Sequence, residues 1–110
     1  MIQDTLTKIE AQIEGTDSIK GGRKAELLGL LTTLKTEIGQ LSRTHTEQAQ
    51  TITGFAQVST HEATRGERNP RLLKLSLDGL AASVDGIEES HPRLVGIVNR
   101  ICTTLSNLGV

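Results

Sequence analysis

The chain has 110 residues, with 12 basic and 13 acidic side chains, a net charge of −1 and one aromatic residue, Phe55. This is one domain's worth of sequence. A single aromatic side chain cannot build the sugar platforms, base-stacking surfaces or aromatic cages that need several flat rings, and the evenly mixed charges form no basic stripe for nucleic acid or anionic lipid.

Cysteine usage and hydropathy indicate the compartment. Cys102 is the only cysteine, so no internal disulfide can form and a reducing compartment fits best. No run approaches the roughly 18 apolar residues of a membrane span, and the first residues lack the charged and apolar regions of a signal peptide. We expect a soluble, cytoplasmic protein with neither membrane nor nucleic acid among its partners.

The first predicted helix covers residues 2–14. Its aliphatic residues recur at the four-three spacing of a heptad: Ile2, Leu6, Ile9 and Ile13. Gly15 suits the end of a helix. Residues 16–22 are predicted to be a loop, because the two adjacent glycines at its end would cost a helix interior about 2 kcal/mol.

The second predicted helix begins near Arg23 and extends at least to residue 42. It carries the most regular stripe of the chain: Leu27, Leu31, Leu34, Ile38 and Leu41. No proline follows, so we expect the helix to continue to about residue 64. Threonines lower the helix propensity of residues 43–68, and apolar residues there also alternate as in a strand, but a lone strand is unstable. A break near Ser42 is the alternative.

Two proline signals mark the remaining helices. Asn69-Pro70 predicts a helix over residues 70–89, since asparagine caps helices and proline suits the first turn. Its stripe is Leu73, Leu77, Leu80, Val84 and Ile87. His91-Pro92 repeats the signal for a helix over residues 92–108, with His91 as the N-cap. Its stripe is Leu94, Val98, Ile101, Leu105 and Leu108, and Gly109 is the expected stop.

These elements predict an all-α protein over residues 1–110, a single helical domain. Short connections favour antiparallel helical hairpins, and the heptad spacing favours coiled-coil-like packing. We expect a bundle of four helices with a long second helix, or of five helices if the middle one breaks.

The C-terminal segment carries a resemblance. Residues 87–94 (IEESHPRL) and 105–110 (LSNLGV) resemble the uncharacterised bacterial family called domain of unknown function 4404, in a Glu-x-x-His-Pro-x-Leu segment and a Leu-Gly-aliphatic ending. Residues 27–41 fit the family more loosely, and residues 43–68 look longer than its usual middle. The resemblance implies a short helical protein of bacterial origin and implies no particular activity.

The histidines are the first candidates for chemistry. His45, His61 and His91 are never four residues apart, the spacing that places two imidazoles on one helix face. His61-Glu62 begins a motif like that of a metalloprotease, but Arg65 stands at the second ligand position and a guanidinium does not bind zinc. We therefore predict no metal site, with a metal- or ligand-dependent regulator using these three histidines as the alternative function.

Other side chains do not form a catalytic pattern. Cys102 lies on the apolar stripe of the last predicted helix, where a thiol packs as a small hydrophobe. Glu88 and Glu89 are adjacent and diverge by about 100° on a helix. We predict no catalytic residue and no cofactor, and hence a protein that is not an enzyme.

The leading functional hypothesis is protein–protein association, as a homodimer or larger oligomer, with an unidentified protein as the other possible partner. Heptad stripes in a chain of only 35% hydrophobic residues need partners. The predicted oligomer seam is Leu27, Leu31, Leu34, Ile38, Leu41, Ile52 and Phe55. A peripheral membrane-associated factor is a weaker alternative, because such a helix needs a basic face and bulky anchors.

Overall fold

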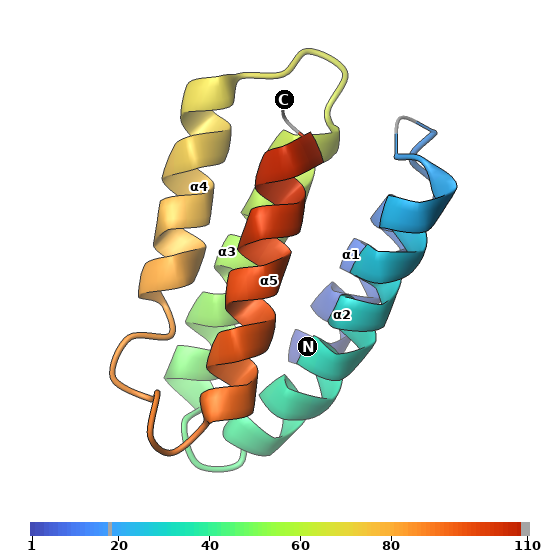
Figure 1. The fold of residues 1–110 in the computed structure, drawn as a ribbon. Coiled ribbons are helices and arrows are strands. Elements are labelled where there is room, and N and C mark those ends of the chain that lie inside the picture. The colour runs from blue at the N-terminus through green and yellow to red at the C-terminus, as the bar shows by residue number, and fades with distance from the viewer. Residues whose placement is uncertain (18, 109–110) are drawn as a thin grey trace.

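The computed structural model describes residues 1–17 and 19–108, so the stop expected at Gly109 lies outside the described residues. Five helices follow one another: α1 (Ile2–Glu14), α2 (Gly21–Leu41), α3 (Thr46–Thr64), α4 (Pro70–Ala82) and α5 (Pro92–Leu108). The described residues contain no strand, which confirms the predicted all-α bundle in its five-helix form (Figure 1).

Helix α3 is the central element of the bundle. It packs against each of the other four helices, and in Figure 1 it stands behind α5, between α4 and the α1–α2 pair. Small residues occupy its buried face, among them Ala49, Ala56, Ser59 and Ala63. Because the distance between packed helices depends on the side chains at the contact, these residues let several neighbours approach α3 at once.

The predicted long second helix is wrong, because the chain turns at residues 42–45. The His45 N–H donates to the Leu41 carbonyl at 2.8 Å, and His45 leaves helical geometry with φ −136° and ψ 63°. A helix from 23 to 64 would be about 63 Å long at 1.5 Å per residue, whereas the longest extent of the folded chain is 37 Å. The turn instead lays Ile52 and its neighbours against the rest of the core, which removes apolar surface from water.

Helix α4 also ends earlier than predicted, at Ala82 instead of residue 89. Ser83 Oγ donates to the Leu80 carbonyl at 2.5 Å, and Gly86 has a φ of +90°, a conformation that favours glycine. The heptad positions Val84 and Ile87 are nevertheless buried, at 2% and 6% exposure. The apolar spacing therefore predicted burial correctly, although these residues lie in a turn.

Helix α1 spans the predicted range 2–14, and α5 starts at the predicted residue 92 and continues to Leu108, the last residue that the structure describes. At the start of α4, Asn69 Oδ1 accepts hydrogen bonds from the Arg71 and Leu72 N–H groups, each at 3.1 Å, and Pro70 is the first helical residue. Arg68 donates through Nη1 to the Leu108 carbonyl, which ties the α3–α4 connection to the last turn of α5.

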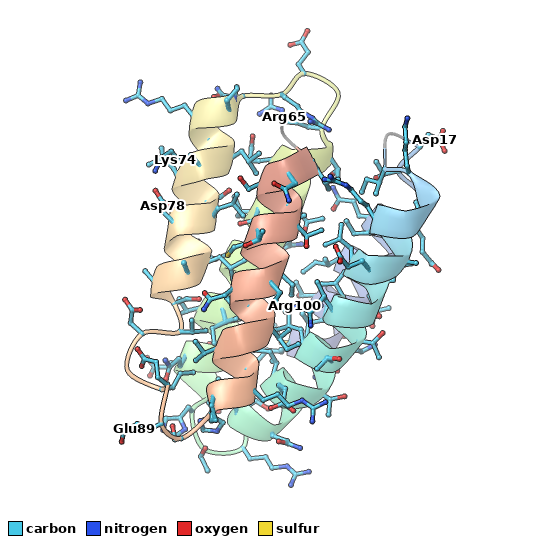
Figure 2. The ribbon with its side chains drawn as sticks, viewed as in Figure 1. Asp17, Arg65, Lys74, Asp78, Glu89 and Arg100 are labelled. Carbon is cyan, nitrogen blue, oxygen red and sulfur yellow. The ribbon has the colours of Figure 1, made fainter. Side chains whose placement is uncertain are left out.

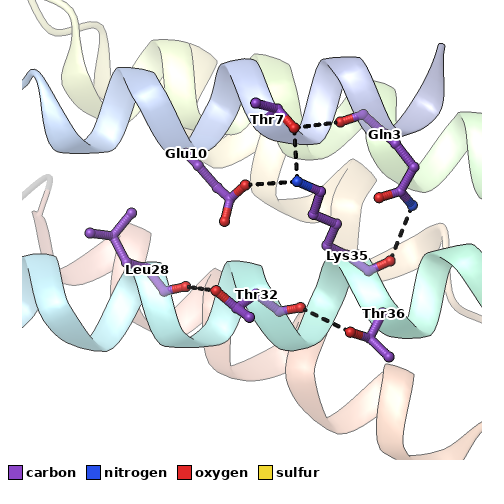
Figure 3. A network of polar contacts seen from close by, with 7 residues as sticks. All are labelled: Gln3, Thr7, Glu10, Leu28, Thr32, Lys35 and Thr36. Atoms are coloured by element: carbon purple, nitrogen blue, oxygen red, sulfur yellow. Dashed lines mark hydrogen bonds and ion pairs between the residues drawn. The ribbon is translucent and has the colours of Figure 1, made fainter.

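A polar network joins α1 to α2 outside the apolar core (Figure 3). Lys35 Nζ lies 2.8 Å from Thr7 Oγ1 and 3.3 Å from Glu10 Oε1, and Gln3 Nε2 donates to the Lys35 carbonyl at 3.2 Å. These contacts set the register of the first hairpin. In the part of the chain that the structure describes, no helix combines the length and the apolar character needed to cross a bilayer.

Candidate functional site

The predicted oligomer seam lies mostly inside the folded chain, so the expectation that it meets a partner needs correction. Six of its seven residues are between 0% and 3% exposed: Leu27, Leu31, Leu34, Ile38, Leu41 and Ile52. Helix α2 packs on α1 and α5, and α3 packs on α1 and α4. The heptad stripes therefore find their partners within one chain, and these six side chains present no surface to a second molecule.

Phe55, the seventh residue of that set, is 37% exposed. Its ring lies against α4 at Gly79, where an added Cβ would be 2.6 Å from Phe55 Cδ1 and 2.9 Å from Cζ. Real Cβ atoms do not come so close to a ring carbon. Gly79 therefore provides the space in which the aromatic ring crosses from α3 onto α4.

Three other large apolar side chains are exposed on the same two helices as Phe55 and Gly79. Val58 on α3 is 49% exposed, and Leu72 and Leu75 on α4 are 42% and 58% exposed. Residues three or four apart share a helix face, so Val58 follows Phe55 while Leu75 and Leu72 precede Gly79. Because α3 and α4 run in opposite directions (Figure 1), we infer from this spacing that the four side chains share one side of the pair. We call Phe55, Val58, Leu72 and Leu75 the α3–α4 apolar face.

A pair of opposite charges borders this face. Lys74 Nζ lies 2.9 Å from Asp78 Oδ2, and their side chains are 77% and 63% exposed. Both belong to α4 (Figure 2), and the charge of Asp78 also reaches Cys102 on α5. The two residues flank Leu75 in the sequence, so an exposed leucine stands beside one positive and one negative group.

Two of the three histidines come together at one end of the bundle. His45 directly precedes α3 and His91 directly precedes α5, and their ring centroids are 6.1 Å apart with planes at 81°. His45 Nδ1 lies 2.7 Å from Thr44 Oγ1, and His91 Nδ1 lies 2.9 Å from Ser90 Oγ. The predicted capping role of His91 falls to its backbone, because its carbonyl accepts the Val95 N–H at 3.2 Å while its ring faces Ser90.

His61 lies apart from that pair, in the last turn of α3. Its Nε2 is 3.9 Å from Glu62 Oε2, and Glu62 is 7% exposed and accepts from Arg65 Nη1 at 3.0 Å. Arg65 thus neutralises a buried carboxylate. Across the residues that the structure describes, no group of three or more His, Cys, Asp or Glu side chains is placed to hold a metal ion.

Cys102 is half-buried on α5, and its Sγ lies 3.8 Å from the Leu77 carbonyl. Burial, with a smaller contribution from the negative charge of Asp78, raises the pKa of the thiol from 9.0 to about 11. Since the thiolate is the nucleophile and the metal ligand, this cysteine is poorly suited to either role at neutral pH.

Sequence reasoning did not single out the exposed members of the α3–α4 apolar face other than Phe55. One signal was available: Leu75 falls two residues after Leu73, on the opposite side of the helix from the stripe that continues to Leu77 and Leu80. A leucine placed against its own helix's stripe is a candidate for surface exposure. The His45–His91 pair offered no such signal, because 46 positions separate the two residues (91 minus 45).

Comparisons with known proteins bear on family membership alone. No curated protein and no solved structure matches the chain. The family described as Domain of unknown function (DUF4404) matches residues 27–110. The matched range begins within α2 and leaves out α1. It includes residues 43–68, where we expected the resemblance to lapse. This range covers well over half of the chain, and the protein belongs to the DUF4404 family.

Proposed function

We propose that this protein is a non-enzymatic helical association module that forms a homodimer through the α3–α4 apolar face. The observation that carries the proposal is the exposure of Phe55, Val58, Leu72 and Leu75, each at least 37%, on the two helices that pack on each other at Gly79. Within the described chain, Met1 is the other exposed large hydrophobic residue. A grouped set of apolar side chains marks an interaction surface more strongly than scattered ones do.

The size of this face predicts a weak dimer. Helix α4 has 13 residues and is therefore about 20 Å long, and two adjacent helices present a strip about 20 Å wide. The face covers roughly 400 Å² per copy, half of the ~800 Å² per partner of a standard stable interface. We expect a dissociation constant on the order of 10–100 μM.

The charges beside Leu75 favour a second copy as the occupant. If two α4 helices cross antiparallel about a two-fold axis near Leu75, Lys74 of each copy approaches Asp78 of the other. A two-fold interface must be complementary to itself. One positive and one negative group near its centre meet this requirement, because the symmetry creates two equivalent Lys74–Asp78 contacts between the copies. An unrelated protein with a matching helical face is the alternative partner.

Sedimentation velocity from 5 to 500 μM tests the proposal, with Leu75→Glu as the test variant and Ala25→Glu as the matched control. Both variants place a glutamate at an exposed helical position, and α2, which carries Ala25, does not contact α4 within the described structure. We expect the wild type and Ala25→Glu to shift from monomer to dimer over this range, and Leu75→Glu to stay monomeric. A monomeric wild type at 500 μM, or equal dimerisation of all three, would overturn the proposal.

We further propose that the protein acts in the cytoplasm, without nucleic acid or membrane as a partner. The lone, half-buried Cys102 suits a reducing compartment. The near-equal numbers of acidic and basic side chains provide no excess positive charge to attract a polyanion or an anionic bilayer.

A further inference from the structure

We propose that His45 and His91 together bind a divalent transition-metal ion of the kind that prefers imidazole, such as Zn²⁺ or Ni²⁺, with water completing the coordination. This site goes beyond the proposed association and does not depend on it. It is formed by the turns that precede α3 and α5, which the fold brings to the same end of the bundle.

The backbone of both histidines is held on either side. His45 N–H donates to the Leu41 carbonyl and His91 N–H donates to the Ile87 carbonyl, each at 2.8 Å. Their own carbonyls accept from the first turns of α3 and α5, at 3.0 and 3.2 Å respectively. The two imidazoles therefore occupy equivalent positions at two helix starts, and the approach of their rings is set by the packing of the bundle.

The hydrogen bonds of the rings suit a metal-binding tautomer. Ligating histidines usually donate from one ring nitrogen to a nearby acceptor, which leaves the other nitrogen with its lone pair available. Thr44 Oγ1 and Ser90 Oγ lie 2.7 and 2.9 Å from the Nδ1 atoms of His45 and His91. A hydroxyl oxygen accepts an N–H, so each ring can hold its proton on Nδ1 and offer Nε2.

The ring separation fits one shared ion. A metal–nitrogen distance of about 2.05 Å places each ring centre about 3.2 Å from the ion, so two imidazoles on one ion have centroids at most about 6.4 Å apart. The observed 6.1 Å lies within this limit. A tetrahedral angle requires about 5.2 Å, and rotation of the exposed His45 side chain provides that approach.

Charges near the pair permit a cation. Arg93 is the basic residue nearest to His91 in sequence, and its Nε lies 3.9 Å from Glu37 Oε2. Within three residues of a histidine lie the exposed carboxylates Glu47, Glu88 and Glu89 and the exposed guanidiniums Arg43 and Arg93. Of the two guanidiniums, Arg93 is the one paired with Glu37. The end of the bundle that carries the pair therefore holds more acidic than unpaired basic groups.

Isothermal titration of the full-length protein with ZnCl₂ and NiCl₂ tests the site. With only two protein ligands, we expect one ion per chain and a dissociation constant of roughly 10 μM, and no heat from MgCl₂, because Mg²⁺ prefers oxygen ligands. His45→Asn and His91→Asn should each weaken binding at least tenfold. His61→Asn is the matched control and should bind as the wild type does.

Two further measurements separate the site from its alternatives. Circular dichroism establishes that each variant remains helical. If a variant unfolds, its titration is replaced by ¹H–¹⁵N spectra of the wild-type imidazoles recorded while diamagnetic Zn²⁺ is added. The ¹⁵N resonances of Nε2 in both rings should then shift together. The proposal would be overturned if His45→Asn and His91→Asn still bind metal, or if His61→Asn loses binding to the same extent. It would also be overturned if Zn²⁺ shifts only the signals of other residues, or if the wild type binds no metal at 500 μM.

Discussion

The ring of Phe55 occupies the space that a side chain at Gly79 would fill, so α3 and α4 cross where an aromatic residue meets a residue without a Cβ. An added Cβ at residue 79 would lie 2.6 Å from Phe55 Cδ1. Glycine in the interior of α4 costs about 1 kcal/mol of helix propensity relative to alanine. Its presence there is accounted for by the ring that it admits.

Coupling between Phe55 and Gly79 should appear in a double-mutant cycle. Gly79→Ala alone must displace the ring toward solvent, and we expect it to lower the free energy of unfolding by about 0.5–1 kcal/mol, because the lost burial outweighs the gain in propensity. In a Phe55→Ala background the same substitution should raise it by up to about 1 kcal/mol. Urea unfolding followed by circular dichroism gives the four values, and equal effects of Gly79→Ala in both backgrounds would contradict the packing described here.

The Lys74–Asp78 pair allows a charge-swap test of the homodimer. Lys74→Asp replaces attraction by repulsion both within α4 and across the proposed two-fold axis, and we expect dimerisation to weaken about 5- to 30-fold. The double variant Lys74→Asp/Asp78→Lys restores opposite charges in every copy and should return to within about twofold of the wild type.

Sedimentation equilibrium at 50 mM and 500 mM salt measures both variants. High salt should reduce the difference between them, because exposed charges are screened. A double variant as impaired as the single one would argue against a self-complementary interface and would favour a different partner.

Two leucines distinguish the core from the surface of the bundle. Leu34 on α2 is 0% exposed and Leu75 on α4 is 58% exposed. Leu34→Ala should lower the free energy of unfolding by about 2–5 kcal/mol, because it removes buried methyl groups and leaves a cavity. Leu75→Ala should change it by less than about 0.5 kcal/mol at concentrations where the protein is monomeric. Thermal and urea unfolding compare the two, and similar losses would place Leu75 in the core.

The thiol of Cys102 should react slowly in the folded protein. Burial raises its pKa to about 11, so iodoacetamide should label the native protein at pH 8 at least tenfold more slowly than the protein in 8 M urea. Because the folded pKa exceeds the unfolded value, the contribution of this thiol to stability is complete below pH 9 and is lost as the pH rises toward 11. Cys102→Ala should not show this loss between pH 9 and 11. Rapid native labelling at pH 8 would contradict the burial.

Local patterns in the chain were enough to predict the helices that have strong signals at their ends. Asn69-Pro70 marks the start of α4, and the four-three spacing of aliphatic residues predicts which side of each helix is buried, since both depend on neighbours within a few residues. The same spacing could not tell an interface inside the chain from one between chains. Leu27 and Leu41 need an apolar neighbour of either origin, and the packing of α1 and α5 on α2 provides it within one chain.

Long-range packing accounts for what the local patterns missed. The turn at residues 42–45 forms because a folded chain with a small-residue helix at its centre buries more apolar surface than one extended helix does. A short stretch of sequence does not contain the distant residues on which this difference in burial depends. The approach of His45 to His91, and of Phe55 to Gly79, follows from that turn and from the early end of α4. Both candidate surfaces of this protein therefore arise where helices distant in sequence are packed side by side.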